Sequence, residues 1–195
     1  MNLANCVTLL RIPLLLLVVA FMYMSEINIR WCATLSLMLF ILCGVTDWLD
    51  GYLARTRKII STLGTFMDAL MDKIFMVGVM ITLLTFGILP RWSLFLVLII
   101  VGREFLVTAI RLVAATENII IAASHSGKVK TVIQIVSTGI FILWFALHQD
   151  FGVWLRPSWI SWIWYGGLIL FLYSTYLTIS SGAIYVYKYR DLLEK

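Results

Sequence analysis

The chain contains 195 residues, of which 62% are hydrophobic and only 13% are charged, and its formal net charge is +5. Soluble globular domains are about half apolar and a quarter charged, so this composition excludes an ordinary soluble domain and indicates a protein embedded in a membrane. The basic residues do not form a face interleaved with exposed aromatic residues, which argues against nucleic acid as a partner.

Apolar runs of about 20 residues, enough to cross a hydrocarbon core of roughly 30 Å, recur along the sequence. We expect an all-α integral membrane protein with six transmembrane helices, at about residues 7–24, 31–53, 67–89, 92–112, 130–148 and 159–187. The connections are short, so residues 1–195 are predicted to form a single membrane domain. The last run is longer than one span requires, which predicts a helix that tilts or projects into the cytosol.

Lysine and arginine are distributed unevenly between the two sides of this predicted bundle. With six spans, twelve of the fifteen basic residues fall on one side, and only Arg30, Arg91 and Arg156 fall on the other. Basic connections remain in the cytosol in most membrane proteins. We therefore expect both termini and the cation-rich side to face the cytosol.

Four aspartates occupy the second and third predicted helices near the cytosolic side. Asp47 and Asp50 are three residues apart, and Asp68 and Asp72 are four apart, so each pair shares one helix face. A hairpin would bring the four carboxylates together just inside the membrane boundary. A buried aspartate at the centre of a bilayer costs about 2.5–3.5 kcal/mol, and four repel one another, so cations are needed.

Carboxylate oxygens without histidine or cysteine suit Mg²⁺ or Mn²⁺ better than zinc or copper. Two such divalent ions would balance four carboxylates, an arrangement used for phosphoryl transfer. Helix capping, or pairing with the basic residues of the connection, explains a single aspartate better than four at helical spacing. A small cation transporter is the alternative from another class, although transporters place ionisable residues near the bilayer midplane within repeated segments.

The pattern D-x2-D-G-x2-A-R-x8-G-x3-D-x3-D at residues 47–72 resembles the signature of the CDP-alcohol phosphatidyltransferases. The resemblance implies a six-helix membrane enzyme, usually a homodimer, that transfers the phosphatidyl group of CDP-diacylglycerol to an alcohol and releases CMP. The sequence departs from many bacterial relatives at Ala69, where they carry proline. An alanine there leaves the four carboxylates intact.

The resemblance also implies roles for individual residues. The four aspartates would bind two divalent ions, and Asp72 would also be the general base that deprotonates the acceptor hydroxyl. The pocket for CDP-diacylglycerol would be lined by Asn5, Thr8, Asp50, Gly51, Ala54, Arg55, Ser61 and Gly64. Asn5 and Thr8 belong to an N-x2-T-x2-R segment that resembles the start of the family, although either residue is also typical of a helix N-cap.

A second polar connection, residues 102–131, is rich in cations that a neutral acceptor alcohol would not require. Its segments resemble the R-E-x2-V-T-x2-R and G-K-x-K-T patterns of phosphatidylglycerophosphate synthases, bacterial inner-membrane enzymes whose active site faces the cytosol. The resemblance implies sn-glycerol 3-phosphate as the acceptor, with its phosphate bound by Arg111, Lys128, Lys130, Arg103 and His125. Glu104 is expected to pair with a basic neighbour and orient it.

Two alternatives stay open for these cations. Some basic residues near the ends of spans follow from the cytosolic preference of positive charge alone, and a lone loop histidine is typically solvated. The same chemistry with inositol phosphate, serine or another phosphorylated alcohol is the alternative acceptor class.

Overall fold

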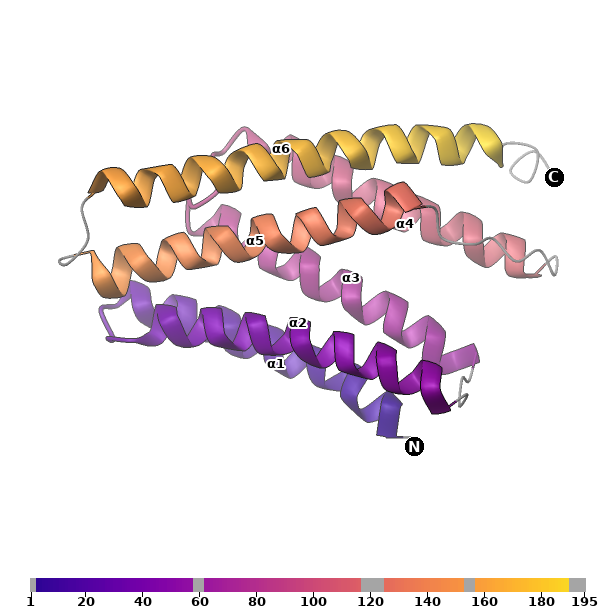
Figure 1. Ribbon diagram of the computed structural model, residues 1–195, viewed down its shortest axis with the longest axis horizontal. Helices are drawn as coiled ribbons and strands as arrows, with labels where there is room; N and C mark the ends of the chain where they lie inside the picture. The colour runs from indigo at the N-terminus through magenta and orange to yellow at the C-terminus, as the bar shows by residue number, and fades with distance from the viewer. Residues whose placement is uncertain (1–2, 58–61, 117–124, 153–156, 190–195) are drawn as a thin grey trace.

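The computed structural model describes residues 3–57, 62–116, 125–152 and 157–189, and within these ranges the regular secondary structure is entirely helical. Its six helices are α1 (Leu3–Glu26), α2 (Cys32–Arg57), α3 (Thr62–Thr85), α4 (Ser93–Thr116), α5 (His125–Phe151) and α6 (Pro157–Lys188). They lie roughly along one axis and alternate in direction (Figure 1). The prediction of an all-α bundle of six elements is confirmed.

The helices extend beyond the predicted apolar runs at one end of the bundle. α2 continues to Arg57, α4 continues to Thr116 and α5 begins at His125. Arginine, lysine, alanine and leucine are good helix formers, so the polar segments extend the helices instead of interrupting them. Consequently Ala54 and Arg55 lie on α2, and His125, which we expected in a loop, is the first residue of α5.

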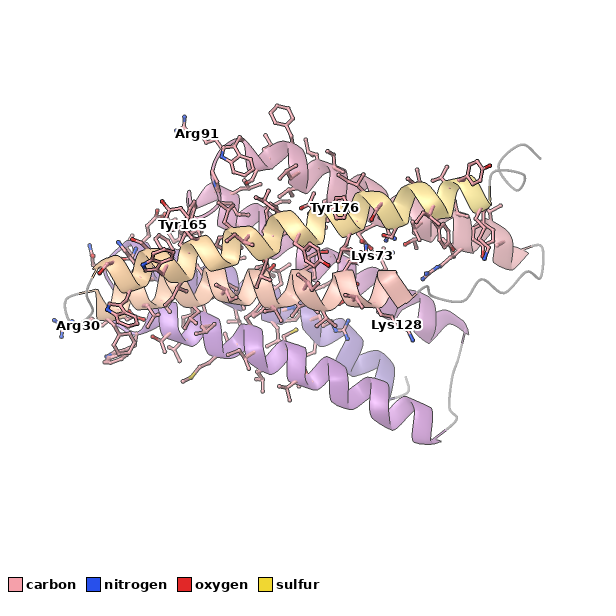
Figure 2. The ribbon with its side chains drawn as sticks, turned by 45° about the horizontal axis from the view of Figure 1, so that its top comes forward. Arg30, Lys73, Arg91, Lys128, Tyr165 and Tyr176 are labelled. Carbon is pink, nitrogen blue, oxygen red and sulfur yellow. The ribbon has the colours of Figure 1, made fainter. Side chains whose placement is uncertain are left out.

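Among the residues that the structure describes in full, three helices are long and apolar enough to cross a membrane, over Ser93–Ala114, Gly127–Phe151 and Ser158–Lys188. In α2, a shorter apolar stretch, Cys32–Thr46, precedes the first aspartates. Helix α1 begins, and helix α6 ends, at the same end of the bundle (Figure 1). Figure 2 shows Arg30 and Arg91 toward the opposite end, whereas Lys73 and Lys128 lie toward the end where α5 begins.

The core forms where α1, α2, α3 and α5 meet and continues between α5 and α6. Phe40 of α2 stacks on Phe75 of α3 at a centroid distance of 6.0 Å. Phe141 of α5 is buried against Trp164 and Phe171 of α6. Dense aromatic and aliphatic packing of this kind fixes the relative positions of the helices that carry the polar site.

Buried hydroxyl groups in these helices bond to nearby main chain. Thr138 and Thr178 each donate to the carbonyl four residues earlier, at 2.8 and 2.7 Å. Ser137 of α5 donates to the carbonyl of Gly167 on α6 at 3.0 Å. Small residues that allow such close helix contacts, and hydroxyls satisfied by the main chain, suit packing inside a membrane.

The N-terminus of α2 is capped by a residue from another helix. Asp150, near the end of α5, accepts hydrogen bonds from the main-chain N–H groups of Trp31 and Thr34 and from the Thr34 hydroxyl, at 2.7–3.0 Å. Trp31 has a positive φ of 69° and packs edge-on against Phe151. These contacts anchor the turn between α1 and α2 at the end of the bundle opposite the predicted site.

Candidate functional site

Helices α2 and α3 carry the aspartate pattern on consecutive turns. The main chain is helical through residues 47–57 and again from residue 62, so the expected spacing along one face of each helix is confirmed. Of the predicted metal ligands, only Asp72 has a described side chain. Within the described part of the chain, no group of three or more acidic, histidine or cysteine side chains is placed to bind a metal ion. The convergence of the four carboxylates therefore stays a prediction.

Most of the predicted nucleotide pocket also lies outside the described side chains. Ser61 is outside the described residues altogether, and for the others the structure gives the helical main chain alone. These residues are Asn5, Thr8, Asp50, Gly51, Ala54, Arg55 and Gly64. Asn5 and Thr8 lie in the first turns of α1, at the end of the bundle where α2 ends and α3 begins (Figure 1).

Asp72 lies on α3 where this helix faces α1, α2, α4 and α5. Its carboxylate is 3.8 Å from the guanidinium of Arg11 on α1, and its side chain is 44% exposed whereas that of Arg11 is buried. It borders a small cavity between α1, α2, α3 and α5, and also a cavity of about 40 Å³ between α3, α4 and α5. A carboxylate that is held by a buried cation and remains accessible has the properties that a general base requires.

On the α4 side of Asp72, three cations converge on Glu104. Lys130 of α5 forms an ion pair with the Glu104 carboxylate, and the Arg103 guanidinium lies 3.4 Å from the same oxygen. Lys73, the residue after Asp72, donates a hydrogen bond to the main-chain carbonyl of Glu104 at 3.2 Å. Lys130 is only 2% exposed. The expectation that Glu104 pairs with and orients basic neighbours is confirmed by this geometry.

This cluster has more positive than negative charge. Lys73 lies within electrostatic reach of Asp72, Arg103 and Arg111, and Lys130 lies within reach of Arg103 and Lys73. Among the described residues, two carboxylates, Glu104 and Asp72, lie beside these four cations, so the described part of the cluster carries an excess of positive charge. Cations held together in such a setting favour an anion as ligand, and phosphate is well matched to lysine and arginine.

The other predicted acceptor residues are less closely joined. Arg111 is exposed, and its Nε donates to the hydroxyl of Tyr185 on α6 at 3.2 Å. Lys128 is exposed near the start of α5, on the side of the bundle shown in Figure 2. The side chain of His125 is outside the described residues. Arg103 and Lys130 thus share the carboxylate of Glu104, and Arg111 lies near them.

Several residues of this region were not expected from the sequence as parts of the site. Lys73, the residue after the last aspartate, was assigned no role in the site, and Arg11 was the unassigned last residue of the N-x2-T-x2-R segment. That segment was the available signal for Arg11. On α6, the Ser181 hydroxyl accepts a hydrogen bond from Arg103 and the Tyr185 hydroxyl accepts one from Arg111. No pattern in the sequence pointed to either residue.

A larger cavity, of about 680 Å³, lies at the opposite end of the bundle. It is lined by residues of the α1–α2 turn and the end of α5, including Asn28, Arg30 and Asp150. Asp150 is already engaged in capping α2, and the cavity is separated along the bundle from every predicted site residue. Its size therefore does not make it the candidate site.

Comparison with known proteins assigns the chain to a family. The sequence model described as CDP-alcohol phosphatidyltransferase matches residues 1–173. The chain is 34% identical over 151 residues to the CDP-diacylglycerol–glycerol-3-phosphate 3-phosphatidyltransferase of Bacillus subtilis (strain 168), which covers 73% of this chain and 77% of that protein.

Two further relatives have similar names. The chloroplastic/mitochondrial CDP-diacylglycerol–glycerol-3-phosphate 3-phosphatidyltransferase 1 of Arabidopsis thaliana is 32% identical over 207 residues, covering 100% of this chain and 65% of that protein. The enzyme of that name from Escherichia coli (strain K12) is 29% identical over 194 residues, covering 98% of each chain. Since the family match extends over most of the sequence, this chain belongs to the CDP-alcohol phosphatidyltransferase family.

Proposed function

We propose that the protein transfers the phosphatidyl group of CDP-diacylglycerol to sn-glycerol 3-phosphate, giving phosphatidylglycerophosphate and CMP. The family and the names of the relatives support this reaction class and this acceptor. The observation that carries the acceptor is the cluster of Lys73, Arg103 and Lys130 beside Asp72. A phosphorylated acceptor bound there would bring its hydroxyl toward the only described carboxylate of the aspartate pattern.

Asp72 is the proposed general base. Arg11 holds its carboxylate from the α1 side, and its partial exposure leaves an oxygen accessible to the acceptor hydroxyl. Asp72 takes the proton as the hydroxyl oxygen bonds to the β-phosphorus of CDP-diacylglycerol, and the bond from that phosphorus to CMP breaks. General-base catalysis of this kind contributes about 10²–10⁴ in rate.

Members of this family generally use divalent metal ions, and the donor set fits them. Asp47, Asp50, Asp68 and Asp72 offer only oxygen ligands, which suit Mg²⁺ or Mn²⁺. Two such ions would neutralise the pyrophosphate and stabilise charge on the CMP leaving group. The half-exposed carboxylate of Asp72 is accessible to a cation from the cavities on either side.

The nucleotide end of CDP-diacylglycerol is proposed to bind at the helix ends that carry the signature. Gly51, Ala54 and Gly64 lack bulky side chains, which would let the cytidine and pyrophosphate approach the main chain. Arg55 would pair with a phosphate, because a guanidinium can make two parallel hydrogen bonds. Asp50, Ser61, Asn5 and Thr8 complete the proposed pocket.

The acceptor phosphate is proposed to bind between α4 and α5. Lys130 and Arg111 would contact it directly, with Lys128 and His125 at the start of α5 and Arg103 supporting the cluster. Among the described residues, Lys130 pairs with one carboxylate, Glu104, which it shares with Arg103. Part of its positive charge is therefore available to a phosphate.

We further propose that all six helices cross the bacterial inner membrane, with both termini and the active site facing the cytosol. Three helices have the required length and composition, and α1 begins at the same end of the bundle where α6 ends (Figure 1). The acyl chains of CDP-diacylglycerol would remain in the bilayer. The functional unit is proposed to be a homodimer, as the family resemblance implies.

The test is CMP release by the purified protein in detergent with CDP-diacylglycerol and Mg²⁺ or Mn²⁺. Glycerol 3-phosphate, inositol phosphate, inositol and serine are compared as acceptors. We expect CMP with glycerol 3-phosphate alone, none after chelation of the metal, and none from Asp72→Asn. Turnover with another acceptor would overturn the acceptor assignment. Folded protein that is inactive with every acceptor, but carries a cation flux in liposomes, would overturn the reaction in favour of a transporter.

A further inference from the structure

The C-terminal part of α6 packs against the face of α4 that carries two arginines. Helices α4 and α6 run in the same direction and are in contact (Figure 1). Arg103 and Arg111 are eight residues apart, so they lie on one side of α4, two turns from each other. Between them, Val107 and Ile110 form a small buried cluster with Tyr185 of α6. The contact between the helices is therefore fixed at the level of the two arginines.

Each arginine has a specific partner on α6. The Arg103 guanidinium donates to the hydroxyl of Ser181 at 3.0 Å. The Nε of Arg111 donates to the hydroxyl of Tyr185 at 3.2 Å, and its guanidinium carbon lies 5.7 Å from the centre of the Tyr185 ring. Ser181 and Tyr185 are both buried. A guanidinium has five N–H donors, and the contact with Tyr185 uses one of those of Arg111.

Gly182 completes this surface. A methyl group added at Gly182 would lie 2.8 Å from Cγ and 3.4 Å from Nε of Arg103. The absence of a side chain therefore lets the stem of Arg103 lie directly on the α6 main chain. Any larger residue would displace Arg103. Its contact with Glu104, whose carboxylate also pairs with Lys130, would then change.

The α4 side of these contacts lies within the region that matches the family model, whereas the α6 residues Ser181, Gly182 and Tyr185 lie beyond its end at residue 173. The proposed phosphatidyl transfer depends on the α2–α3 pattern, whereas the acceptor phosphate is proposed to bind the cations of α4 and α5. A surface beyond residue 173 that holds cations near Asp72 is thus placed to affect the acceptor without altering the shared reaction.

We propose that Ser181, Gly182 and Tyr185 are positioning residues that hold Arg103 and Arg111 for the phosphate of the acceptor, and so determine acceptor specificity. This inference rests on the proposed function. Tyr185 acts through Arg111, and Ser181 and Gly182 act through Arg103. A tyrosine hydroxyl and ring restrict a guanidinium that is otherwise exposed, which lowers the entropy lost when phosphate binds.

The test compares matched variants on the same helix. Tyr185→Phe removes the hydroxyl that holds Arg111, and Tyr176→Phe removes an exposed one. Gly182→Ala displaces Arg103, and Gly166→Ala adds a methyl group where nothing lies within 4 Å. The KM for glycerol 3-phosphate should rise roughly three- to tenfold in Tyr185→Phe and Gly182→Ala, on the scale of one ordinary intramolecular hydrogen bond. The KM for CDP-diacylglycerol should not change, and both controls should match the parent.

A double-mutant cycle separates positioning from a general effect on structure. If Tyr185 acts through Arg111, Tyr185→Phe should have no further effect on the KM for glycerol 3-phosphate in an Arg111→Met background. Full additivity of the two changes, or an equal rise in the KM for both substrates, would overturn the inference. If the parent turns over glycerol 3-phosphate and Tyr185→Phe and Gly182→Ala keep its KM, this inference alone fails. If the parent does not use glycerol 3-phosphate, the proposed function fails, and this inference fails as well.

Discussion

At the scale of single residues, the pair formed by Arg11 and Asp72 connects α1 to the part of α3 that carries the proposed general base. Arg11 is buried, whereas Asp72 is half exposed. Loss of Arg11 therefore leaves a carboxylate that water can still solvate, and the main consequence should be a misplaced base instead of an unfolded protein.

We expect Arg11→Met to lower kcat by about tenfold or more, because a general base must lie within hydrogen-bond reach of the hydroxyl. Arg91→Met, an exposed arginine at the opposite end of the bundle, is the matched control and should behave as the parent. The measurement is CMP release under saturating substrates, with thermal melting to verify folding. A folded Arg11→Met protein with the kcat of the parent would contradict the role of this contact.

Lys130 and Glu104 form the most buried ion pair among the described residues. Breaking a buried pair by removing one partner leaves an uncompensated charge and costs about 3–5 kcal/mol, whereas removing both partners costs much less. Glu104→Gln should therefore lower the free energy of unfolding by roughly 3 kcal/mol. The double variant Glu104→Gln/Lys130→Met should regain part of that stability, because Arg103 still lacks its carboxylate partner.

Unfolding in a denaturing detergent measures both effects, and Lys128→Met, which removes an exposed lysine, is the control for stability alone. The activity of the double variant should not recover with its stability. It lacks a proposed phosphate ligand and should remain poorly active with glycerol 3-phosphate. Equal stability of the single and double variants would show that Glu104 does not offset the charge of Lys130.

At the scale of elements, α2 depends on α5 at one end and presents the aspartate pattern at the other. Asp150 caps α2 through Trp31 and Thr34, and caps of this type contribute about 0.5–2 kcal/mol. We expect Asp150→Ala to lose about 1–2 kcal/mol of stability, and Gln149→Ala, its exposed neighbour, to lose almost none. Because the cap lies at the opposite end from Asp72, KM values for both substrates should match the parent. A large change in either KM would contradict this separation of cap and site.

The helices themselves were predictable, because each depends on a long apolar run that the sequence displays directly. The aspartate pattern was equally accessible, since spacings of three and four have a fixed meaning on a helix. Contacts between helices that are distant in the sequence could not be predicted. Whether Lys73 points to Asp72 or to Glu104, and whether Arg111 meets Tyr185, depends on how α3, α4 and α6 pack, and no local spacing encodes that.

The polar segments near the ends of the predicted spans are partly helical, although we expected them to connect the helices. The predicted spans at residues 31–53 and 67–89 left a longer connection between them than the structure has, because α2 continues to Arg57 and α3 begins at Thr62. Charge marks where a helix leaves the hydrocarbon, but it does not end the helix, because arginine and lysine favour helical main chain. The same reason places Lys128 on α5 instead of in the connection before it.

At the scale of the whole molecule, the unequal distribution of cations predicts the orientation in the membrane. Arg30 and Lys188 are both exposed and belong to opposite ends of the bundle (Figures 1 and 2). In a background without the native cysteines, Arg30→Cys should react with a membrane-impermeant maleimide in right-side-out vesicles, and Lys188→Cys should react only after the membrane is opened. The reverse pattern would place the site on the outer face and contradict the proposed orientation.

The central claim is that the acceptor hydroxyl oxygen, deprotonated by Asp72, bonds to the β-phosphorus of CDP-diacylglycerol. The most direct measurement is mass spectrometry of the products formed from sn-glycerol 3-phosphate carrying ¹⁸O in its C1 hydroxyl group. We predict that the lipid product retains the heavy oxygen between glycerol and phosphorus, that CMP is unlabelled, and that Asp72→Asn forms neither product. Label recovered in CMP, or a lipid product without the label, would contradict this account of the reaction.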